Sequence, residues 1–390
     1  MGYRYAVLGA GRQGTACAYD MVRFGEADEV VLADVSLEIA EAAATRVNDL
    51  LDTSKARARA LDVTEYDAVV EALTGMDAFL SAVPYYYNLA ITRAAVQAGA
   101  SMCDLGGNTD LVREQLQLDP QAREAGISIV PDCGQVPGMG STLMVYAMSF
   151  LDEPEEVFMW DGGLPQNPRP PFGYLLTFNI AGLTNEYAEA PVFLRDGKAT
   201  LVPTMDELEE VEFPSPIGLL EAFTTGGGVS TLPWTFEGKL RTLQNKTVRY
   251  PGHFAQLRAF YDLGLWGMDA VGVAEQEVVP RDLFHALFEP LVTYPEDKDV
   301  VVIRVRAVGQ KDGESAEVVL DLMDFYDEET GFTAMERTTG WDAAIVAGMM
   351  ARGQTPRGAT PVELSVPADL FVQELGKRGI GLKTKVRSLT

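Results

Sequence analysis

The stretch VLGAGRQG, residues 7–14, decides the fold of the first third of the chain. Its glycines have Gly-x-Gly-x-x-Gly spacing, and the stretch follows an apolar run and opens a helical pattern over residues 12–24. In such a turn Gly9 permits the tight bend, Gly11 lets the backbone approach a pyrophosphate, and Gly14 lets helix and strand pack closely. The free N–H groups at the helix start favour the phosphates. We therefore predict a dinucleotide-binding turn; the alternative is a glycine-rich turn that binds nothing.

An acidic residue lies where the next strand of such a unit ends. Asp34 closes the apolar run EVVLAD (29–34), twenty residues after Gly14. A carboxylate at this point accepts hydrogen bonds from the ribose 2′-hydroxyl of an adenosine and repels a 2′-phosphate. The sequence thus predicts NAD as the cofactor and makes NADP less favoured, although Arg12 in the turn is able to face a phosphate. The alternative role for Asp34 is a strand-end cap.

Short apolar strands and helices alternate over the first 133 residues. Helices of this length between strands act as crossover connections, which pair the strands in parallel. We predict an α/β fold for residues 1–133, a Rossmann-type doubly wound parallel sheet that binds the dinucleotide. The expected strands are 4–8, 29–34, 58–63, 77–83, 100–106 and 127–132, and the expected helices are 12–24, 36–51, 64–74, 88–98 and 109–125.

The pattern changes after residue 133, where strand-like runs joined by hairpin-like turns become frequent. We predict a second, α+β domain over residues 134–335, built on a mostly antiparallel sheet and serving substrate binding and dimerisation. Residues 336–390 are expected to form C-terminal helices that return to the first domain. The expected strands are 156–164, 174–180, 191–197, 238–250, 300–309, 315–326 and 332–339, and the expected helices are 137–151, 251–264, 281–293, 340–353 and 367–379.

The chain is strongly acidic, with 57 Asp and Glu against 31 Lys and Arg and a formal charge of -26 over 390 residues. A nucleic-acid binder needs a basic face, so we predict no nucleic-acid partner. The three cysteines lack Cys-x-x-Cys spacing, which predicts no metal site and fits a reducing compartment. Because no apolar run has the length of a membrane span and no charged leader precedes the first strand, we expect no membrane partner, no signal peptide and a cytoplasmic protein.

Ligands of open α/β sheets collect beyond the carboxyl ends of the parallel strands. Three predicted strands end there in polar or flexible stretches: SAVPYYYN (81–88), CDLGGN (103–108) and PDCGQVPGMG (131–140). Tyr86 is a candidate substrate contact, with surface packing as the alternative, and Asp132 is a candidate catalytic group, with turn capping as the alternative. The predicted cofactor contacts are Gly9, Ala10, Gly11, Arg12, Gln13, Gly14, Asp34, Val83, Pro84, Asp104, Gly106 and Asn108, of which Asp104 and Asn108 have capping as an alternative role.

Seven motifs in order along the chain resemble those of the saccharopine dehydrogenase-like oxidoreductases, and are most similar to the lysine 6-dehydrogenases among them. The resemblance implies a Rossmann domain with an inserted α+β substrate domain, usually assembled as homodimers. It also implies NAD-dependent oxidation of the ε-amino group of lysine to the 6-semialdehyde, which cyclises to an imine. The motifs are GAGRQG (9–14), DLGGN (104–108), DCGQVPGMG (132–140), GGLPQNPRPPFGY (162–174), GLTNEYAEAPVFLRDGK (182–198), LEAFTTGGGVSTLPWTF (220–236) and KTVRYPGH (246–253).

The last motif gathers three side chains that can carry a positive charge, Lys246, Arg249 and His253, within an acidic chain. Arg249 is able to bind a substrate carboxylate through two N–H groups, and Tyr250 adds a hydroxyl. His253 titrates near neutrality and is predicted to contact the substrate or move a proton. The alternatives are a structural ion pair for Arg249 and a helix cap for His253. The predicted catalytic residues are His253, Asp132 and Tyr250, and the predicted substrate contacts are Arg249, Thr225, Ser230, Thr231 and Tyr86.

Two other functions compete with lysine oxidation. One is a saccharopine or related amino-acid imine reductase or dehydrogenase, and the other is an NAD-binding sensor or scaffold without turnover. The stretch TTGGGVSTLP (224–233) lacks the Asn-Arg-Asp-Ser segment that we associate with saccharopine enzymes, and saccharopine carries additional carboxylates. This departure favours lysine as the substrate.

Overall fold

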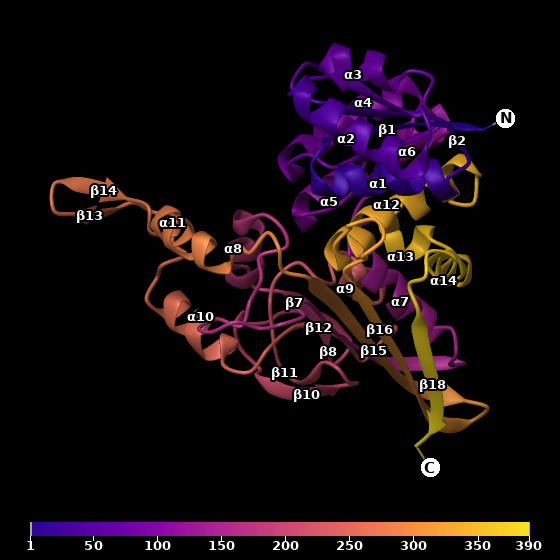
Figure 1. The fold of residues 1–390 in the computed structure, drawn as a ribbon. Coiled ribbons are helices and arrows are strands. Elements are labelled where there is room, and N and C mark those ends of the chain that lie inside the picture. Colours follow the sequence, from indigo (N-terminus) through magenta and orange to yellow (C-terminus); the bar gives the residue numbers. More distant parts are fainter. Residues whose placement is uncertain (1, 390) are drawn as a thin grey trace.

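The computed structural model describes residues 2–389 and contains two large sheets (Figure 1). The first has seven strands in the order β17-β6-β5-β4-β1-β2-β3, and all its pairs are parallel. Its strands are β1 (Tyr3–Leu8), β2 (Ala27–Asp34), β3 (Ala56–Ala60), β4 (Ala78–Ser81), β5 (Ser101–Asp104), β6 (Ser128–Val130) and β17 (Gly358–Ala359). The helices between them are α1 (Arg12–Phe24), α2 (Leu37–Leu51), α3 (Tyr66–Leu73), the 3-10 helix η1 (Tyr85–Tyr87), α4 (Asn88–Ala98), α5 (Thr109–Leu116) and α6 (Asp119–Ala125).

Both faces of this sheet are covered. Along β1, Tyr5 and Val7 belong to one hydrophobic cluster, whereas Ala6 and Leu8 belong to another. Alternate residues of a strand point to opposite faces, so each face has its own core. The predicted fold class, a doubly wound parallel sheet with a second α+β domain, is therefore confirmed. The helix expected over 109–125 is divided into α5 and α6, and a proline lies in the first turn of α6.

The second sheet has nine strands and is antiparallel except for the β12–β7 pair. Its main path runs β10-β11-β12-β7-β15-β16-β18, and β8 and β9 branch from β12. The strands are β7 (Glu153–Pro165), β8 (Val192–Arg195), β9 (Lys198–Leu201), β10 (Glu209–Phe213), β11 (Gly218–Phe223), β12 (Thr242–Arg249), β15 (Asp299–Lys311), β16 (Glu314–Phe325) and β18 (Leu382–Ser388). The helices of this part are α7 (Met139–Met148), α8 (Ile180–Ala188), α9 (Leu232–Thr235), α10 (His253–Asp262) and α11 (Pro280–Val292), with a separate hairpin of β13 (Val271–Val273) and β14 (Gln276–Val278).

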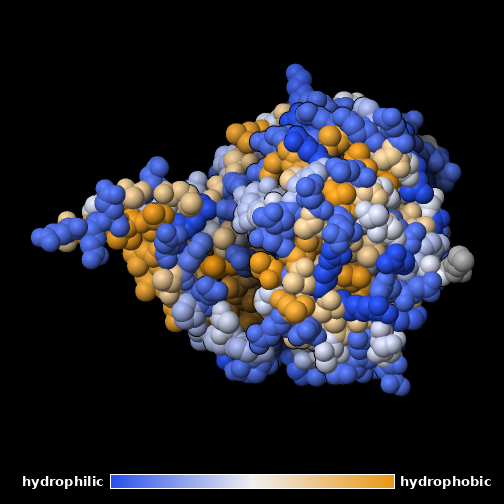
Figure 2. All heavy atoms as spheres, turned by 90° about the horizontal axis from the view of Figure 1, so that it is seen from above, coloured by the Kyte–Doolittle hydropathy of each residue, from blue (hydrophilic) through white to orange (hydrophobic). Residues whose placement is uncertain are grey.

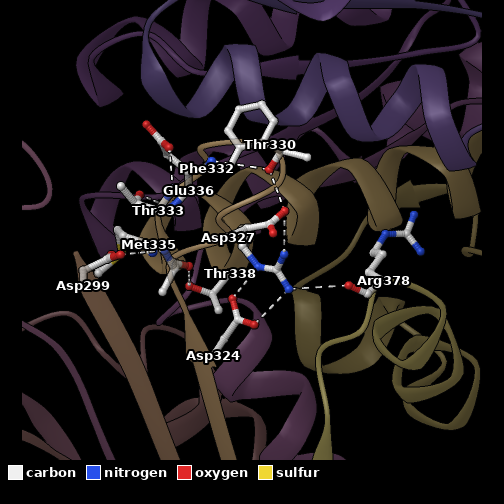
Figure 3. A network of polar contacts seen from close by, with 12 residues as sticks. Asp299, Asp324, Asp327, Thr330, Phe332, Thr333, Met335, Glu336, Thr338 and Arg378 are labelled. Carbon is white, nitrogen blue, oxygen red and sulfur yellow. Dashed lines mark hydrogen bonds and ion pairs between the residues drawn. The ribbon is translucent and has the colours of Figure 1, made fainter. Parts of the chain in front are cut away.

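Two segments expected as strands are not strands. Residues 174–180 run without regular structure into α8, whose start is capped by the Asn179 side chain. Residues 332–339 contain the start of α12 (Ala334–Ala351), where Thr333 and Glu336 form a capping box. The Asp299 carboxylate accepts two further hydrogen bonds from backbone N–H groups at this helix start (Figure 3). Because these acceptors satisfy the free N–H groups of the first turn, they stabilise a helix in a segment rich in strand-forming residues.

The C-terminal segment joins both halves of the molecule. Helix α12 packs against α1, β4 and β5, and the short β17 extends the first sheet by pairing with β6. Beyond the short helix α13 (Val362–Ser365) and α14 (Ala368–Lys377), β18 pairs with β16 and forms an edge of the second sheet. The sequence pattern did not predict this last strand. One hydrophobic cluster extends from β1 through α12 and α7 to β15, so the two sheets share a core. The domain boundaries at residues 133 and 335 stay predictions.

Within residues 2–389, no helix combines the length and the apolar character that a membrane crossing requires. The part of the chain around α11 and the β13–β14 hairpin projects from the body as an arm, which we define as residues 263–292 (Figure 1).

Candidate active site between the two domains

The glycine loop, residues 9–14, has the geometry of a phosphate cradle. Gly9 adopts a φ of +94°, which an L side chain rarely tolerates. A Cβ on Gly14 would lie 1.9 Å from the carbonyl oxygen of Gly9, so only glycine fits there. A Cβ on Gly11 would meet no atom within 4 Å, which leaves open space beside the backbone at the start of α1. The loop therefore fits the pyrophosphate of a dinucleotide.

The Asp34 carboxylate holds this loop against the end of β2. One oxygen accepts a hydrogen bond from the Ala10 N–H at 2.9 Å, and the other accepts from the Ser36 N–H at 3.0 Å. The side chain is only partly buried, and each oxygen retains acceptor capacity. Asp34 thus combines the two roles that the sequence left open, a strand-end cap and a free acceptor beside the cradle.

Among the other predicted cofactor contacts, Val83 lies beside the glycine loop, whereas Arg12 is bound to another residue of the protein. Val83, next to Pro84 at the end of β4, approaches the glycine loop, with a methyl carbon 3.2 Å from where a Gly9 Cβ would be. Arg12 donates its Nε–H to Glu336 at 2.8 Å, so it is tied to α12 and is not extended toward a phosphate. A Cβ on Gly340 of α12 would lie 2.7 Å from the Gln13 carbonyl oxygen, which places α12 against this loop.

The Asp104 side chain forms hydrogen bonds with other residues of the first domain. Its buried carboxylate accepts hydrogen bonds from the N–H groups of Gly106 and Asp132 and from the Gln115 amide. Burial raises its pKa, and these three donors oppose the shift. Asn108 caps α5 by accepting from the Leu111 N–H at 3.0 Å. The observed roles of Asp104 and Asn108 are thus the structural alternatives, and direct cofactor contact at these positions stays a prediction.

Asp132 and Ser230 join the two domains. The Ser230 hydroxyl donates to Asp132 Oδ2 at 2.5 Å, and both residues have positive φ, +63° for Asp132 and +37° for Ser230. Burial and then the nearby Asp104 charge raise the pKa of Asp132 to about 8. Two residues predicted from separate motifs are therefore in direct contact. Thr231 turns instead to the buried Glu363 carboxylate at 2.9 Å.

A cavity of about 220 Å³ opens between the domains on this side. Asn108 lines it from the first domain, and Ser230 and Trp234 line it from the second. The Arg113 guanidinium lies 4.9 Å from the Trp234 ring centroid, so α5 and α9 are in contact across the boundary. The cavity is therefore lined from both domains.

Deeper in the second domain, Arg249 is the centre of a buried group that we call the Arg249 cluster: Arg249, Glu186, Tyr174, Tyr187 and His253. Arg249 is 3% exposed. Its Nε–H donates to the Tyr187 hydroxyl at 2.8 Å, and its Nη1 donates to the Val248 carbonyl at 2.9 Å. Its Nη2 lies 3.6 Å from Glu186 Oε1. These contacts use Nε–H and one N–H of Nη1, so Nη2 keeps N–H groups for a substrate carboxylate, and the two-pronged grip stays a prediction.

His253 is a neutral member of this cluster. The Phe172 carbonyl can only accept, so the 3.1 Å contact to Nδ1 places the ring proton on that nitrogen. Nε2 then accepts from the Tyr187 hydroxyl at 3.1 Å, and Tyr187 accepts from Arg249. Burial and then the Arg249 charge lower the pKa of His253 to about 3. The prediction that His253 titrates near neutrality is therefore wrong.

The remaining predicted residues lie at varied distances from this cluster. The Thr225 and Thr247 hydroxyls are 2.7 Å apart, and Thr247 donates to Glu186 at 2.8 Å, so Thr225 connects to the cluster through Thr247. The Tyr250 hydroxyl donates to the Pro165 carbonyl at 3.1 Å, so it is bound to backbone rather than to Arg249. Tyr86 is 59% exposed on η1 and contacts its neighbouring tyrosine rings, which is the surface-packing alternative.

Sequence reasoning missed several residues of this site. Asp161 on β7, Asn245 on β12 and Gln135 from the loop after β6 lie on one polar face, and Gln135 donates to Asp161 Oδ2 at 3.2 Å. Burial and then the charge of Glu186 raise the pKa of Asp161 to about 7. A signal was present in the sequence, because Asn245, Thr247 and Arg249 alternate along one strand and must share a face.

Among residues 2–389, no group of three or more His, Cys, Asp or Glu side chains is placed to hold a metal ion.

The geometry defines a class of protein: a Rossmann domain with a dinucleotide cradle, joined to an α+β domain that holds a buried ionic cluster near the same edge. Residues 5–130 match the family model described as the saccharopine dehydrogenase NADP binding domain, and residues 134–380 match the saccharopine dehydrogenase C-terminal domain. The chain therefore belongs to the saccharopine dehydrogenase family. The predicted family is confirmed, while the closer likeness to lysine 6-dehydrogenases stays a prediction.

Curated relatives and solved structures agree with this family. The NADP(+), L-glutamate-forming saccharopine dehydrogenase of Saccharomyces cerevisiae is 22% identical over 248 residues, which cover 61% of this chain and 54% of the relative. The mitochondrial alpha-aminoadipic semialdehyde synthase of Mus musculus is 21% identical over 367 residues, 75% of this chain and 39% of the relative. The chain thus spans about half or less of the length of these relatives.

Apo saccharopine dehydrogenase (L-Glu forming) from Saccharomyces cerevisiae has a TM-score of 0.80 at 19% identity, over 99% of this chain and 100% of that one. The homospermidine synthase of Legionella pneumophila, in complex with NAD, has a TM-score of 0.65 at 13% identity, over 100% of this chain and 92% of that one. At these identities the likeness shows the fold.

Proposed function

We propose that the protein is an NAD(P)-dependent oxidoreductase that acts on a carbon–nitrogen bond of lysine or a lysine-derived amino acid, and specifically that it oxidises the ε-amino group of L-lysine to the 6-semialdehyde with NAD. Family membership supports the coarser statement, because the relatives named above are saccharopine dehydrogenase and alpha-aminoadipic semialdehyde synthase. The finer statement rests on the charge balance of the buried site.

That charge balance is the observation that carries the proposal. Among the described residues of the buried site, Arg249 is the one cation, and it already faces Glu186 at 3.6 Å. Asp161 and Asp132 add two further buried carboxyl groups, whose pKa values are raised to about 7 and about 8, so both add negative charge at the alkaline pH of the assay. Lys246 does not relieve this excess, because its ammonium is bound by Glu207 and Glu209. Such a site suits a substrate with an amine and one carboxylate better than saccharopine, which carries more carboxylates.

The proposed roles follow from the contacts. The glycine loop and Asp34 hold the dinucleotide, whose nicotinamide supplies hydride-accepting chemistry when bound. Arg249 Nη2 contacts the α-carboxylate, and Tyr187 and His253 keep the guanidinium in place. Burial of this group excludes water, which strengthens the ionic contact. Of the predicted catalytic residues, Asp132 retains a carboxyl group near the domain boundary, whereas Tyr250 is bound to a backbone carbonyl.

NAD rather than NADP is the proposed cofactor. The partly buried Asp34 beside the cradle repels a 2′-phosphate, and Arg12 is bound by Glu336. The matching family model is described as NADP binding and the yeast relative is NADP-dependent by its name, so the preference needs a direct test. Asp34→Ala should raise the affinity for NADPH at least tenfold relative to NADH in fluorescence titrations; an unchanged ratio would count against Asp34 as the selector.

A substrate panel tests the function itself. We expect NADH formation with L-lysine and NAD at pH 8 to 9, and little with saccharopine or with NADP. Faster turnover of saccharopine would favour the alternative that the relatives support. Stabilisation by NADH without turnover of any amine would favour a sensor or scaffold.

The proposed assembly is a homodimer through the arm. On α11, Phe284, Phe288 and Val292 are buried, whereas Leu283, Leu287 and Leu291 are 44%, 63% and 52% exposed. This leucine row is one exposed helix face, and Figure 2 shows apolar surface along the projecting arm. Leu287→Glu should lower the mass seen by sedimentation from dimer to monomer.

The proposed location is the cytoplasm, because the three described cysteines are free thiols.

A further inference from the structure

Three buried polar atoms near Arg249 form no hydrogen bond of good geometry in the described part of the chain: Asp161 Oδ1, Asn245 Oδ1 and the Tyr174 hydroxyl. Their residues are 7%, 2% and 3% exposed. The Asn245 and Arg249 side chains nevertheless lie close enough to Asp161 and Tyr174 to oppose the rise in their pKa values that burial causes. A buried polar group left unpaired lowers stability by about 1–3 kcal/mol, so proteins rarely keep several together without a use. Their grouping points to a ligand that completes the set.

The strand geometry brings these atoms together. Asn245, Thr247 and Arg249 alternate on β12 and therefore share one face, and Thr247 is the register partner of Asp161 on the neighbouring β7. The Arg249 guanidinium lies 5.3 Å from the Tyr174 ring centroid. The polar face is thus one surface, with Arg249 at one end and Asn245 at the other.

The same face meets the cofactor domain. Gln135 belongs to the loop that follows β6, and its amide donates to Asp161 Oδ2 at 3.2 Å. This contact fixes one carboxylate oxygen, while Oδ1 has no hydrogen bond of good geometry, although the Asn245 side chain lies close enough to oppose the rise in the pKa of Asp161 that burial causes. Because ligands of a Rossmann sheet lie beyond the carboxyl ends of its strands, Asp161 is held next to the edge where the reacting end of a dinucleotide belongs.

The hydrogen-bonding character of the unpaired atoms indicates which kind of ligand group would bind them. The Asn245 amide oxygen and the carboxylate oxygens of Asp161 are acceptors on one face, so a ligand group that pairs with either must be a donor. We propose that Asp161 and Asn245 form the subsite for the reacting amine, and that Asp161 accepts a proton from the substrate ammonium. This inference rests on the proposed function, since it names where the amine of that substrate binds. In the step, an N–H bond breaks, an O–H bond forms on Asp161 Oδ1, and the nitrogen keeps the electron pair.

Asp161 suits this role better than its neighbours. Asp132 already accepts the Ser230 hydroxyl, and Glu186 already accepts from Thr247 while facing Arg249. A carboxyl group with a pKa raised to about 7 is ionised often enough at pH 8 to accept a proton, and it is basic enough to be effective. Asp161 therefore takes the part that the sequence assigned to Asp132 and His253.

Binding separates this inference from the proposed function. Calorimetry of the full chain with NADH present, which prevents turnover, would compare L-lysine with L-norleucine, the same side chain without the ε-nitrogen. We expect wild type to bind lysine at least tenfold more tightly, and Asp161→Asn to weaken lysine binding about 10- to 100-fold while norleucine changes less than twofold. Asn245→Leu should shift the same ratio in the same direction. Asp342→Asn, a buried aspartate elsewhere on α12, is the matched control and should leave the ratio unchanged.

The outcomes are distinct. If Asp161→Asn keeps the lysine preference, or if wild type binds both ligands equally, the amine subsite is wrong. If the preference depends on Asp161 but wild type does not oxidise lysine, the subsite stands and the proposed function falls. Should Asp161→Asn fail to fold, as judged by its melting temperature, Asn245→Leu decides the question alone. If the enzyme is active, its kcat/KM should rise with pH around pH 7 as Asp161 loses its proton. Asp161→Asn should remove this rise, whereas a merely structural role of Asp161 would leave it in place.

Discussion

His253 lies buried beside the Arg249 guanidinium, and both features favour the neutral imidazole. The ring therefore serves as a fixed link between the Phe172 carbonyl and the Tyr187 hydroxyl. Under the proposed function it acts on the substrate through Arg249 and Tyr187, as a positioning residue.

His253→Asn is the first prediction at this scale. Losing the link should loosen Tyr187 and Arg249, raising the KM for the amino acid about tenfold while kcat falls less. Because the pKa of His253 is lowered to about 3, the imidazole has no proton to lose between pH 5 and 9. The shape of the kcat/KM profile in that range should therefore be unchanged. Steady-state kinetics from pH 5.5 to 9.5 checks this, and loss of a limb near pH 6.5 would restore His253 as a titrating group.

Two glycines of the loop give a second, paired prediction. A Cβ on Gly11 meets no protein atom within 4 Å, whereas a Cβ on Gly14 would collide with the Gly9 carbonyl. Gly11→Ala should keep the wild-type melting temperature but weaken NADH binding at least tenfold, because the methyl group occupies the space that a phosphate approaches. Gly14→Ala should lower the melting temperature even without NADH. Thermal denaturation with and without NADH separates the two, and an undiminished NADH response in Gly11→Ala would place the phosphates elsewhere.

At residue scale, the sequence predicted what has a local signature. The glycine spacing and Asp34 specified the cradle, and Arg249 was identified within its motif. The sequence did not identify Asp161 and Glu186 as site residues, because one acidic residue in an acidic chain cannot be distinguished from the others until its neighbours in the fold are known. The pKa of His253 escaped for the same reason, since it depends on burial and on a guanidinium that the fold brings near.

Helix α12 shows how caps decide an element. The segment FTAMERTT contains strand-forming residues, yet Thr333 accepts from the Glu336 N–H while Glu336 accepts from the Thr333 N–H. Asp299 satisfies two more donors of the first turn, so several of its N–H groups have partners (Figure 3). The Thr-x-x-Glu spacing was readable in the sequence as a capping box, but the Asp299 contact comes from β15 and was not.

Removing the cap is the prediction at this scale. Thr333→Ala should lower the free energy of unfolding by about 0.5–2 kcal/mol, as N-cap truncations do. Thr333→Ser keeps the hydroxyl and is the matched control, expected within a few tenths of a kcal/mol of wild type. Urea denaturation of both variants is the measurement. Equal losses in the two variants would mean that the cap hydroxyl does not stabilise α12.

Elements with strong local periodicity were the ones that the sequence predicted well. The expected helix over 12–24 coincides with α1, and the expected strands of the first sheet all exist. The strands β17 and β18 were missed because their pairing is distant in sequence: Gly358 pairs with Ser128, and Val318 with Val386. An edge strand such as β18, with mostly exposed side chains, has little hydrophobic pattern to read.

On the scale of the whole molecule, the C-terminal segment explains why the two domains act as one body. It contributes a strand to each sheet, and α12 lies in the shared hydrophobic cluster together with α7. The Asp132–Ser230 bond closes the boundary on the ligand side. The position of Asp161 next to the cofactor domain depends on this whole arrangement, so no local pattern could have predicted it.

Buried carboxyl groups make the stability of the whole molecule depend on pH. Asp342 on α12 is buried with no hydrogen-bond partner on either carboxyl oxygen in the described chain, and burial raises its pKa well above the usual value. The folded state therefore holds the proton more tightly than the unfolded state. Stability from this group is fully present below the unfolded pKa, near 4, and is lost as pH rises toward and through the folded pKa.

Asp342→Asn removes that dependence, because an amide does not ionise. The difference in free energy of unfolding between the variant and wild type should therefore grow in favour of the variant from pH 5.5 to pH 9, as measured by urea denaturation at each pH. Glu41→Gln makes the same chemical change at an exposed position of α2 and should show no such growth. Asp132 and Asp161 have raised pKa values in the same direction and remain in the variant, so the slope against pH should flatten without vanishing. A variant whose slope equals that of wild type would mean that the Asp342 carboxyl has a compensating partner in solution.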